Sequence, residues 1–290
     1  MTLCEALKNG VLKLKNAGIE EYENDAWLLL SFAAGVSRAY YYAHSENVLP
    51  EEQCLAYLQY IDRRASRVPL QHITHQAYFM GYEFYVDESV LIPRQDTEVL
   101  VEECLKTMKG VPSPRILDMC TGSGCILTSL LLERTDAAGT GADVSKDALK
   151  TAERNAETLG TRERSDFILS NLFSAPYFDE IYRHKERKYD ILVSNPPYIR
   201  TEVIGTLSRE VKDHDPGIAL DGGTDGLYFY REITNAAAGY LKPGGKLLYE
   251  IGYDQAEDVR EILSLGGFKN IHIVKDLSGL DRVAAAELPK

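Results

Sequence analysis

The chain has 290 residues (32.5 kDa), of which 44% are hydrophobic and 26% charged, proportions that exclude disordered and fibrous proteins. Lys and Arg number 32 against 44 Asp and Glu, and the resulting charge of −12 disfavours binding to nucleic-acid phosphates unless basic residues gather on one face. Five cysteines without a C-x-x-C pair and six scattered histidines indicate neither a disulfide framework nor a metal site. No apolar run reaches the roughly 18 residues of a membrane span, and the first ten residues do not resemble a targeting peptide. We therefore expect a cytoplasmic monomer without metal.

The first part of the chain has the pattern of short helices. Thr2 and Glu5 have the spacing of a capping box ahead of a helical stripe of apolar residues. Further helices are predicted over 25–34, after Ser37 as an N-cap, and from Pro50 to about residue 67. We therefore predict an N-terminal helical domain over residues 1–76, for which the resemblance described below implies a role in substrate docking. Its tyrosine cluster at 40–42 suits a partner surface and core packing equally.

Residues 77–92 are predicted to form a β-hairpin linker, because aromatic residues alternate around Gly81. A helix is expected from about Asp96. Arg94 and Glu98, on either side of that helix start, are interpreted as braces of a hinge between the two domains rather than as ligands of a small molecule.

From residue 93 to 290 the pattern becomes that of an α/β domain. Apolar, strand-like runs alternate with amphipathic helices, which is typical of a parallel sheet covered on both faces. The final two runs are joined by a turn too short for a crossover, so we expect them to pair antiparallel at one edge. The expected strands are 115–120, 140–144, 166–170, 189–194, 246–252, 270–277 and 283–288, and the expected helices are 124–135, 146–159, 226–241 and 255–265. The fold predicted is a doubly wound, seven-stranded, mostly parallel sheet, with the basic cluster 183–188 as a solvated loop.

Ligands of such a sheet bind beyond the carboxyl ends of its strands, where the loop from Asp118 to Gly124 (DMCTGSG) follows the first strand. Its glycines let the backbone approach a ligand, and Cys120, Thr121, Gly122, Ser123 and Gly124 are candidate contacts. A dinucleotide fingerprint would need a small residue where Leu127 stands. Asp118 would suit a ligand with a positive centre, such as an ammonium or sulfonium. Taken alone, the loop is equally consistent with a tight structural turn.

Asp143 ends the second strand, 19 residues after Gly124, the spacing at which an acid accepts hydrogen bonds from ribose hydroxyls. An N-cap is the alternative role, but Ser145 can cap the following helix and leave Asp143 available. The glycine loop and this acid together predict an adenosine-containing cofactor and favour S-adenosylmethionine over NAD.

The third motif, Ser194-Asn195-Pro196-Pro197-Tyr198, follows the strand YDILV directly. Two consecutive prolines end the strand and fix the backbone, leaving the Asn195 amide and the Pro196 carbonyl as acceptors beside the Tyr198 ring. Such a set suits a planar NH2 group, of a carboxamide or of adenine, and directs its nitrogen at a sulfonium methyl. Taken alone, the two prolines could simply form a turn that ends the strand. That explanation becomes much weaker once the two preceding motifs are considered together with this one.

With these motifs, the chain resembles the protein-(glutamine) methyltransferases that modify peptide-chain release factors, a family of S-adenosylmethionine-dependent enzymes. The resemblance covers nearly the whole chain and is carried by PLQHI at 69–73, LIPRQDTEVLVE at 91–102, DMCTGSGC at 118–125, SNPPYI at 194–199, DPGIALDGGTDGL at 215–227 and LLYEIG at 247–252. It implies a Rossmann-like methyltransferase domain, a cofactor pocket that includes Asn171 and Leu172 besides the residues above, and Asn195, Pro196, Pro197 and Tyr198 binding the glutamine of a Gly-Gly-Gln loop.

Four positions depart from the family pattern. Cys120 replaces a usual glycine, which puts the close backbone approach there in doubt, and Gln95 replaces a usual proline, which loosens its loop. Asn171 stands where an acid is common, so its contact with the adenine amino group is weakened. Leu172 replaces a frequent aromatic residue and offers apolar cover without stacking.

Two other functions are compatible with parts of the pattern. Adenine methylation on DNA or RNA uses the same acceptor set but predicts a basic groove, whereas residues 1–110 and 111–290 each carry a net charge of −6. A non-catalytic adenosine-binding module predicts loss of Asn195 or Asp143, and both are present. Glu250, at the end of a strand, is interpreted as structural.

Overall fold

The structure is a computed structural model that describes residues 1–290, and it divides into two compact units. The first unit comprises Met1–Gln76 together with Ser208–His214, and the second comprises Ala77–Leu207 together with Asp215–Lys290. The segment 208–214 lies in the region that the sequence assigns to the methyltransferase domain, yet it belongs to the N-terminal unit. The chain therefore passes from the second unit to the first and back between β6 and α13.

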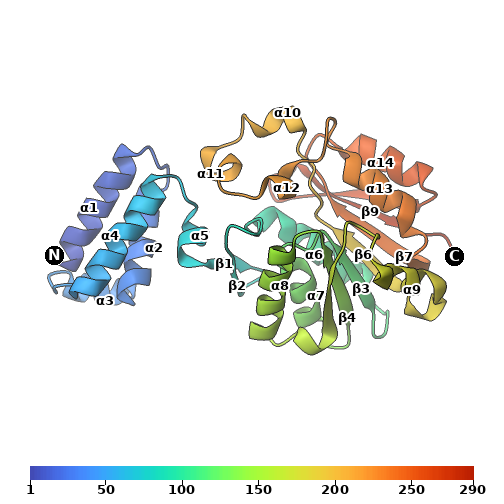
Figure 1. The fold of residues 1–290 in the computed structure, drawn as a ribbon, viewed down its shortest axis with the longest axis horizontal. Helices are drawn as coiled ribbons and strands as arrows, with labels where there is room; N and C mark the ends of the chain where they lie inside the picture. Colours follow the sequence, from blue (N-terminus) through green and yellow to red (C-terminus); the bar gives the residue numbers. More distant parts are fainter. The chain divides into compact units, whose positions relative to one another are not determined.

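The first unit is helical, as predicted. Its helices are α1 (Leu3–Asn16), α2 (Tyr22–Ala34), α3 (Arg38–His44), α4 (Glu51–Ala65), α5 (Leu70–Thr74) and α11 (Arg209–Lys212), labelled in Figure 1. The capping box at Thr2 is present, and the Ser37 hydroxyl accepts a hydrogen bond from the backbone of Tyr40. Helices α1, α2 and α4 enclose an apolar core. Tyr41 packs against this core, which confirms core packing for that residue, while Tyr42 is exposed.

A buried ion pair lies within this unit. Arg64 Nε is 2.7 Å from Asp25 Oδ2, and both residues are less than a tenth exposed. Glu210 of α11 pairs with Arg67 at 3.0 Å and with Arg64 at 3.5 Å. These pairs hold the inserted segment on the N-terminal helices, which explains why 208–214 belongs to this unit.

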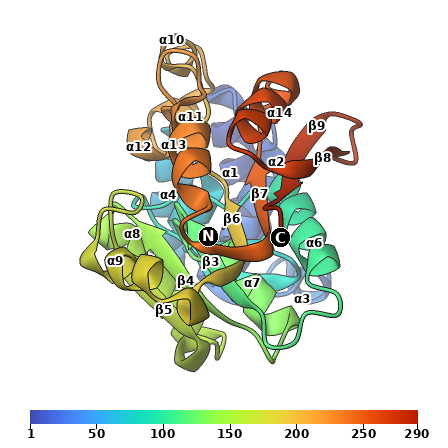
Figure 2. The ribbon, with the colours of Figure 1, turned by 90° about the vertical axis from the view of Figure 1, so that its right-hand side faces the viewer.

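The second unit has the predicted seven-stranded sheet, in the order β5-β4-β3-β6-β7-β9-β8, with only the last two pairings antiparallel. Its strands are β3 (Arg115–Met119), β4 (Ala138–Asp143), β5 (Ser165–Leu169), β6 (Tyr189–Ser194), β7 (Leu241–Glu250), β8 (Lys269–Lys275) and β9 (Asp281–Glu287), and the separate hairpin is β1 (Gln76–Phe79) with β2 (Tyr82–Tyr85). The antiparallel edge is the predicted hairpin of β8 and β9 (Figure 2).

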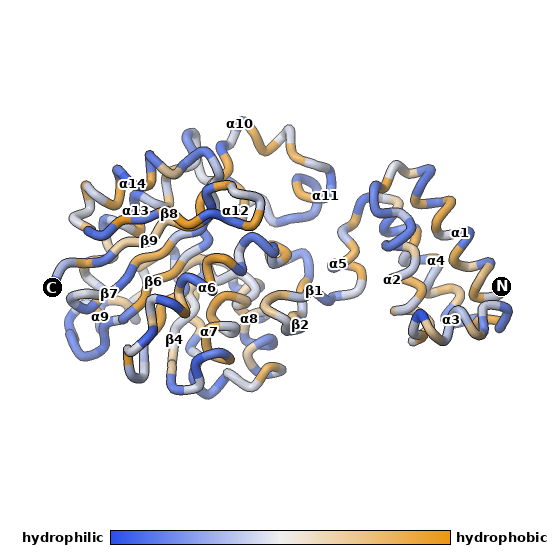
Figure 3. The backbone as a smooth tube through the Cα atoms, turned by 180° about the vertical axis from the view of Figure 1, so that it is seen from behind, coloured by the Kyte–Doolittle hydropathy of each residue, from blue (hydrophilic) through white to orange (hydrophobic).

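Helices cover both faces of the sheet, and two apolar cores result. The core on one face includes side chains of α9 (Pro176–Arg183), α13 (Tyr228–Ala237) and α14 (Ala256–Leu265). The other face packs against α6 (Glu98–Thr107), α7 (Cys125–Glu133) and the β1–β2 hairpin, with α8 (Lys146–Thr158) beside them. Hydrophobic stretches run through α7 and β6 (Figure 3), because both are enclosed on all sides.

Several short elements were not predicted. Helix α9 begins at Pro176 and ends at Arg183, so the exposed basic cluster starts at a helix end and continues as a single 3-10 turn over Lys185–Arg187. Helices α10 (Thr201–Ile204) and α12 (Gly217–Leu220) have four residues each, too few for a hydrophobic period. Strand β7 begins at Leu241, five residues before the predicted start, because the chain extends through Pro243 and two glycines.

We predict that Asp25→Ala destabilises the first unit by about 3 kcal/mol, because it leaves the Arg64 guanidinium buried without its closest carboxylate. Trp27, the single tryptophan, lies in this unit, so its fluorescence during urea unfolding measures the effect locally. Asp62→Ala is the control, since its pair with Lys13 is more than half exposed and should contribute less than about 1 kcal/mol. Equal destabilisation by the two variants would contradict the prediction.

Candidate active site

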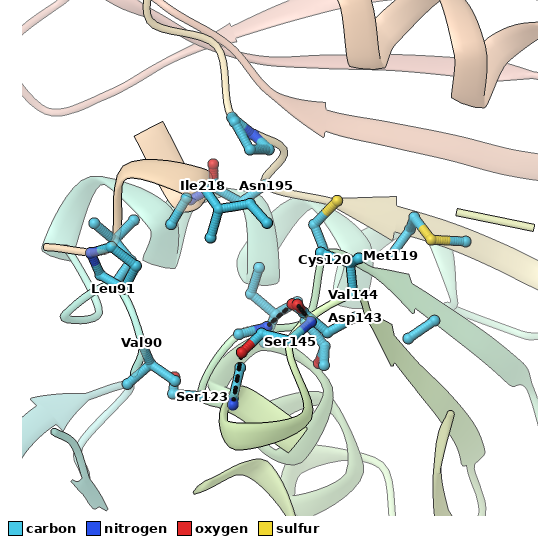
Figure 4. A pocket seen from close by; sticks show the side chains of 18 of the residues that line it. Val90, Leu91, Met119, Cys120, Ser123, Asp143, Val144, Ser145, Asn195 and Ile218 are labelled. Carbon is cyan, nitrogen blue, oxygen red and sulfur yellow. Dashed lines mark hydrogen bonds between the residues drawn. The ribbon is translucent and has the colours of Figure 1, made fainter. Parts of the chain in front are cut away.

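A pocket opens in the second unit beyond the carboxyl ends of β3, β4, β5 and β6. Strand β3 lies between β4 and β6, with Met119 in register with Ala142 on one side and Ser194 on the other. The residues that follow these three strand ends therefore emerge side by side. Figure 4 shows Cys120 and Asp143 on one side of the pocket and Val90 and Leu91 on the other.

The loop after β3 has an unusual backbone. Cys120, Gly122 and Gly124 all have positive φ, at 62°, 54° and 74°. A Cβ at Gly122 would meet nothing within 4 Å, so this glycine leaves open space on the pocket side, whereas a Cβ at Gly124 would lie 2.9 Å from Ala152 Cβ. Gly124 thus permits close packing of α7 against α8 and does not line the pocket, unlike Cys120 to Ser123.

Asp118 lies outside the pocket, contrary to its predicted place beside a positive ligand. Its side chain is fully buried, and Thr121 Oγ1 donates a hydrogen bond of 2.6 Å to its Oδ2. Burial raises the pKa of Asp118 to about 7, with the Asp143 charge adding to the increase. Asp118 therefore stabilises the loop from the protein interior, through its hydrogen bond with Thr121. The sequence places this acid at the right strand end but does not show that helix α7 covers it.

Asp143 lines the pocket at the end of β4. Its Oδ2 accepts from the Gly122 N–H and its Oδ1 from the Ser145 N–H, both at 2.9 Å. Ser145 caps α8 by accepting from Ala148 N, so Asp143 is not needed as the cap. Burial raises the pKa of Asp143. Each carboxylate oxygen still has a second lone pair, which can accept from a hydroxyl of a ligand.

Asn171 and Leu172 also line the pocket, just beyond the end of β5. Leu172 has a φ of 50°, and its carbonyl accepts a hydrogen bond of 2.6 Å from Ser170 Oγ. This turn presents the apolar side chain of Leu172 and the amide of Asn171 together at the pocket edge.

The Asn195–Tyr198 turn is held from several directions. Asn195 and Pro197 line the pocket, whereas Pro196 and Tyr198 lie outside its lining. Tyr198 Oη donates to Glu250 Oε1 at 3.2 Å, and the Tyr198 carbonyl accepts from Gln255 Nε2 at 3.0 Å. The backbone is packed so closely here that a Cβ at Gly222 would lie 2.7 Å from Tyr198 Cα.

Much of the remaining lining was not predicted. It comes from the linker before α6 and from the segment after 208–214, as Ser89, Val90, Leu91, Ile92, Pro93, Arg94, Thr97, Pro216, Ile218 and Ala219. Arg94 Nη2 is 2.8 Å from the buried Asp215 Oδ2, which ties the two segments together. Glu98, the other predicted brace, accepts from Met80 N in the hairpin turn at 2.7 Å. The motifs LIPRQDTEVLVE and DPGIAL gave the only sequence signal for the residues at 91–97 and 216–219, and Ser89 and Val90 had none.

The pocket suits an adenosine ligand with a positive centre. Its walls are mainly apolar, its one lining acid is Asp143, and its one lining cation, Arg94, is already paired with Asp215. Asp143 offers acceptors for ribose hydroxyls, and the open space at Gly122 admits a ligand against the backbone. The structure contains no group of three or more His, Cys, Asp or Glu side chains placed to hold a metal ion, and no helix is long and apolar enough to span a membrane.

Comparison with known proteins shows similarity over nearly the full chain. Residues 5–74 match the family described as the PrmC N-terminal domain, and residues 95–209 match the methyltransferase small domain. The chain is 38% identical over 286 residues to the release factor glutamine methyltransferase of Clostridium acetobutylicum, covering 99% of this chain and 98% of that protein. It is 40% identical over 283 residues to the release factor glutamine methyltransferase of Caulobacter vibrioides, covering 98% and 95%.

Solved structures show the fold. The catalytic domain of hMettl16 in complex with a MAT2A 3′UTR hairpin superposes with a TM-score of 0.57 at 14% identity, covering 80% of this chain and 82% of that chain. A methyltransferase from Pyrococcus furiosus has a TM-score of 0.50 at 14% identity, covering 73% and 91%. Both share the arrangement of sheet and helices.

We predict that Asp118→Asn changes how stability depends on pH. Because the pKa of Asp118 is raised from 3.8 to about 7 in the folded state, its contribution to stability is lost as pH rises through that range, by up to about 4 kcal/mol. The free energy of unfolding of the uncharged Asp118→Asn variant should therefore rise relative to that of the wild type between pH 5 and pH 8. Urea unfolding followed by circular dichroism measures this difference. Leu130→Ala, a core variant that removes no ionisable group, should keep a constant difference in stability from the wild type. The same constant difference for Asp118→Asn would show that its carboxyl is not titrating in this range.

Proposed function

The chain belongs to the family of release factor glutamine methyltransferases, and from this premise we propose that Asn195, Pro196 and Tyr198 hold the side-chain amide of a release-factor glutamine for methylation. The protein transfers a methyl group from S-adenosylmethionine to the amide nitrogen of the glutamine in the Gly-Gly-Gln motif. The observation that carries this proposal is the Asn195 amide, held at the pocket edge next to the loop that follows β3.

One group of residues binds the cofactor, and another binds the amide of the substrate. Cys120 to Ser123, Asp143, Asn171 and Leu172 line the space for the cofactor, which supplies an electrophilic methyl group when bound. Asn195 Oδ1 and the Pro196 carbonyl act as acceptors for the two hydrogens of the substrate NH2 group. Accepting them increases electron density on an otherwise delocalised nitrogen and fixes its direction. Tyr198, the last residue of the turn, lies outside the pocket lining, and its expected role is to cover the planar amide once the substrate is bound.

We also infer the kind of partner and the setting. Net charges of −6 in residues 1–110 and −6 in 111–290 favour a protein substrate over a nucleic acid, although adenine shares the acceptor geometry. The N-terminal unit supplies the docking surface for the release factor, linked to the turn after β6 by the segment 208–214. The protein acts as a monomer in the cytoplasm, where its five free thiols stay reduced.

Replacing Asn195 with Ala should abolish methyl transfer while cofactor affinity, measured by calorimetry, stays near that of the wild type. The reason is that Asn195 provides the acceptor for the substrate amide. Asp143→Ala is the reciprocal variant and should weaken cofactor binding by about tenfold or more, because the ribose acceptors are removed. If cofactor affinity fell as far as activity in Asn195→Ala, the substrate role would be wrong.

The substrate can be identified with labelled S-adenosylmethionine and purified release factor. We expect label in the wild-type factor and none in a variant whose Gly-Gly-Gln glutamine is replaced by alanine. Added DNA and RNA serve as competing acceptors in the same reaction. Label in the nucleic acid, or in the alanine variant, would contradict the proposed function.

A further inference from the structure

The side-chain amide of Asn195 is turned in a definite direction by a neighbour far away in the sequence. Asn195 Nδ2 lies 3.3 Å from Oγ1 of Thr97, 98 residues earlier in the chain. The nitrogen and oxygen of a side-chain amide point in different directions from the same carbon. When Nδ2 points toward Thr97, Oδ1 therefore points away from it. Oδ1 accepts no hydrogen bond from the chain and is available to a substrate.

Thr97 is placed for this contact by the turn that leads into α6. It is the last residue of a 3-10 turn over Gln95–Thr97, which continues directly into α6. Thr97 is 3% exposed and lines the pocket, so its hydroxyl is withdrawn from solvent. The hydrogen bond from Asn195 gives this buried hydroxyl a partner.

Glu250 lies at the other end of the turn. Its side chain is 2% exposed and accepts a hydrogen bond from Tyr198 Oη at 3.2 Å, and burial raises its pKa. At the Asn195 end, Asn195 Nδ2 is the donor and Thr97 Oγ1 is the acceptor.

We propose that Thr97 is a positioning residue that sets the orientation of the Asn195 amide, so that its oxygen meets an NH2 group and the site selects amide or amino nitrogen. Thr97 contacts the Asn195 end of the turn, and Glu250 holds the Tyr198 end. Glu250 thus keeps the structural role that the sequence indicates. This proposal rests on the proposed function for the identity of the substrate, but the orientation itself does not depend on that identity.

Without the Thr97 hydroxyl the Asn195 amide is free to rotate by half a turn. Its NH2 would then face the NH2 of the substrate, two donors without an acceptor, which disfavours binding in the reactive geometry. Thr97→Val keeps the shape of the side chain and removes only the hydroxyl. The effect is expected in kcat, because orientation of the bound amide is lost while the cofactor pocket keeps its lining.

The test compares three variants and a control with the wild type on a release factor at saturating cofactor. Thr97→Val should lower kcat about ten- to a hundredfold, with cofactor affinity and melting temperature near those of the wild type. Thr97→Ser, which keeps the hydroxyl, should restore kcat to within about threefold. Thr107→Val is the matched control on α6, since its hydroxyl bonds only to the Cys104 carbonyl, and should leave kcat unchanged. Glu250→Gln keeps an acceptor for Tyr198 Oη and leaves the contact between Thr97 and Asn195 in place, so its kcat should stay closer to that of the wild type than the kcat of Thr97→Val.

A second measurement reports orientation without activity. In 15N-labelled protein, the side-chain NH2 signals of Asn195 are those lost in Asn195→Ala, and Thr97→Val should shift them while Thr107→Val should not. Unshifted signals with wild-type kcat would overturn the proposal. So would equal loss of kcat in Thr97→Val and Thr97→Ser together with lowered melting temperatures, which indicates packing alone. Failure of the wild type to methylate the release factor, with the Asn195 signals shifted as expected, would instead overturn the proposed function and support the orientation.

Discussion

The site depends on the parallel pairing of β3 with β4 on one side and β6 on the other. This pairing brings the ends of three strands to one level, so that Cys120, Asp143 and Asn195 follow neighbouring ends. Ser194 Oγ donates to the Met119 carbonyl at 2.5 Å and locks the last residue of β6 to the last residue of β3. A shift of either strand by one residue would exchange the buried and pocket sides of every group that follows. The register of the sheet therefore sets the spacing between cofactor and substrate residues.

The loop after β3 contains a residue with an unfavourable backbone conformation, Cys120, which the pairing with β4 holds in place. A cysteine at a φ of 62° costs about 1 kcal/mol relative to the ordinary region. The loop is nevertheless fixed, because the Thr121 N–H donates to the Ala142 carbonyl at 3.1 Å and the Gly122 N–H donates to Asp143. These bonds to β4 fix the backbone conformation of the loop, and neither of them involves the side chain of residue 120. These neighbouring bonds hold Cys120 in the left-handed region of the backbone.

The sequence predicted what short-range patterns determine. The glycine loop, Asp143 and the Asn195–Tyr198 turn each follow a strand that is recognisable from its own apolar residues, so their common location could be inferred from topology. Asp118 could not be placed, because its burial depends on α7 and on packing between elements. Likewise Thr97 and Asn195 meet across 98 positions, and nothing in either local pattern indicates the contact. The four-residue helices α10 and α12 carry too little periodicity to be seen, although the second contributes Ile218 to the pocket.

The ionisable groups of the site favour hydrogen-bond acceptance over proton abstraction. Burial and the nearby Glu250 charge raise the pKa of the Tyr198 phenol, and burial and Asp143 raise the pKa of the Cys120 thiol, so both stay protonated at neutral pH. No histidine lines the pocket, and both Asp143 oxygens already accept backbone hydrogen bonds. A reaction that began by removing a proton would lack a base here. Methylation of an amide nitrogen has no such need, because the proton is lost after the new bond has made the nitrogen positive. The reaction requires instead an acceptor oxygen that is correctly oriented toward the substrate NH2 group. The orientation of the Asn195 side-chain amide is therefore important for this site.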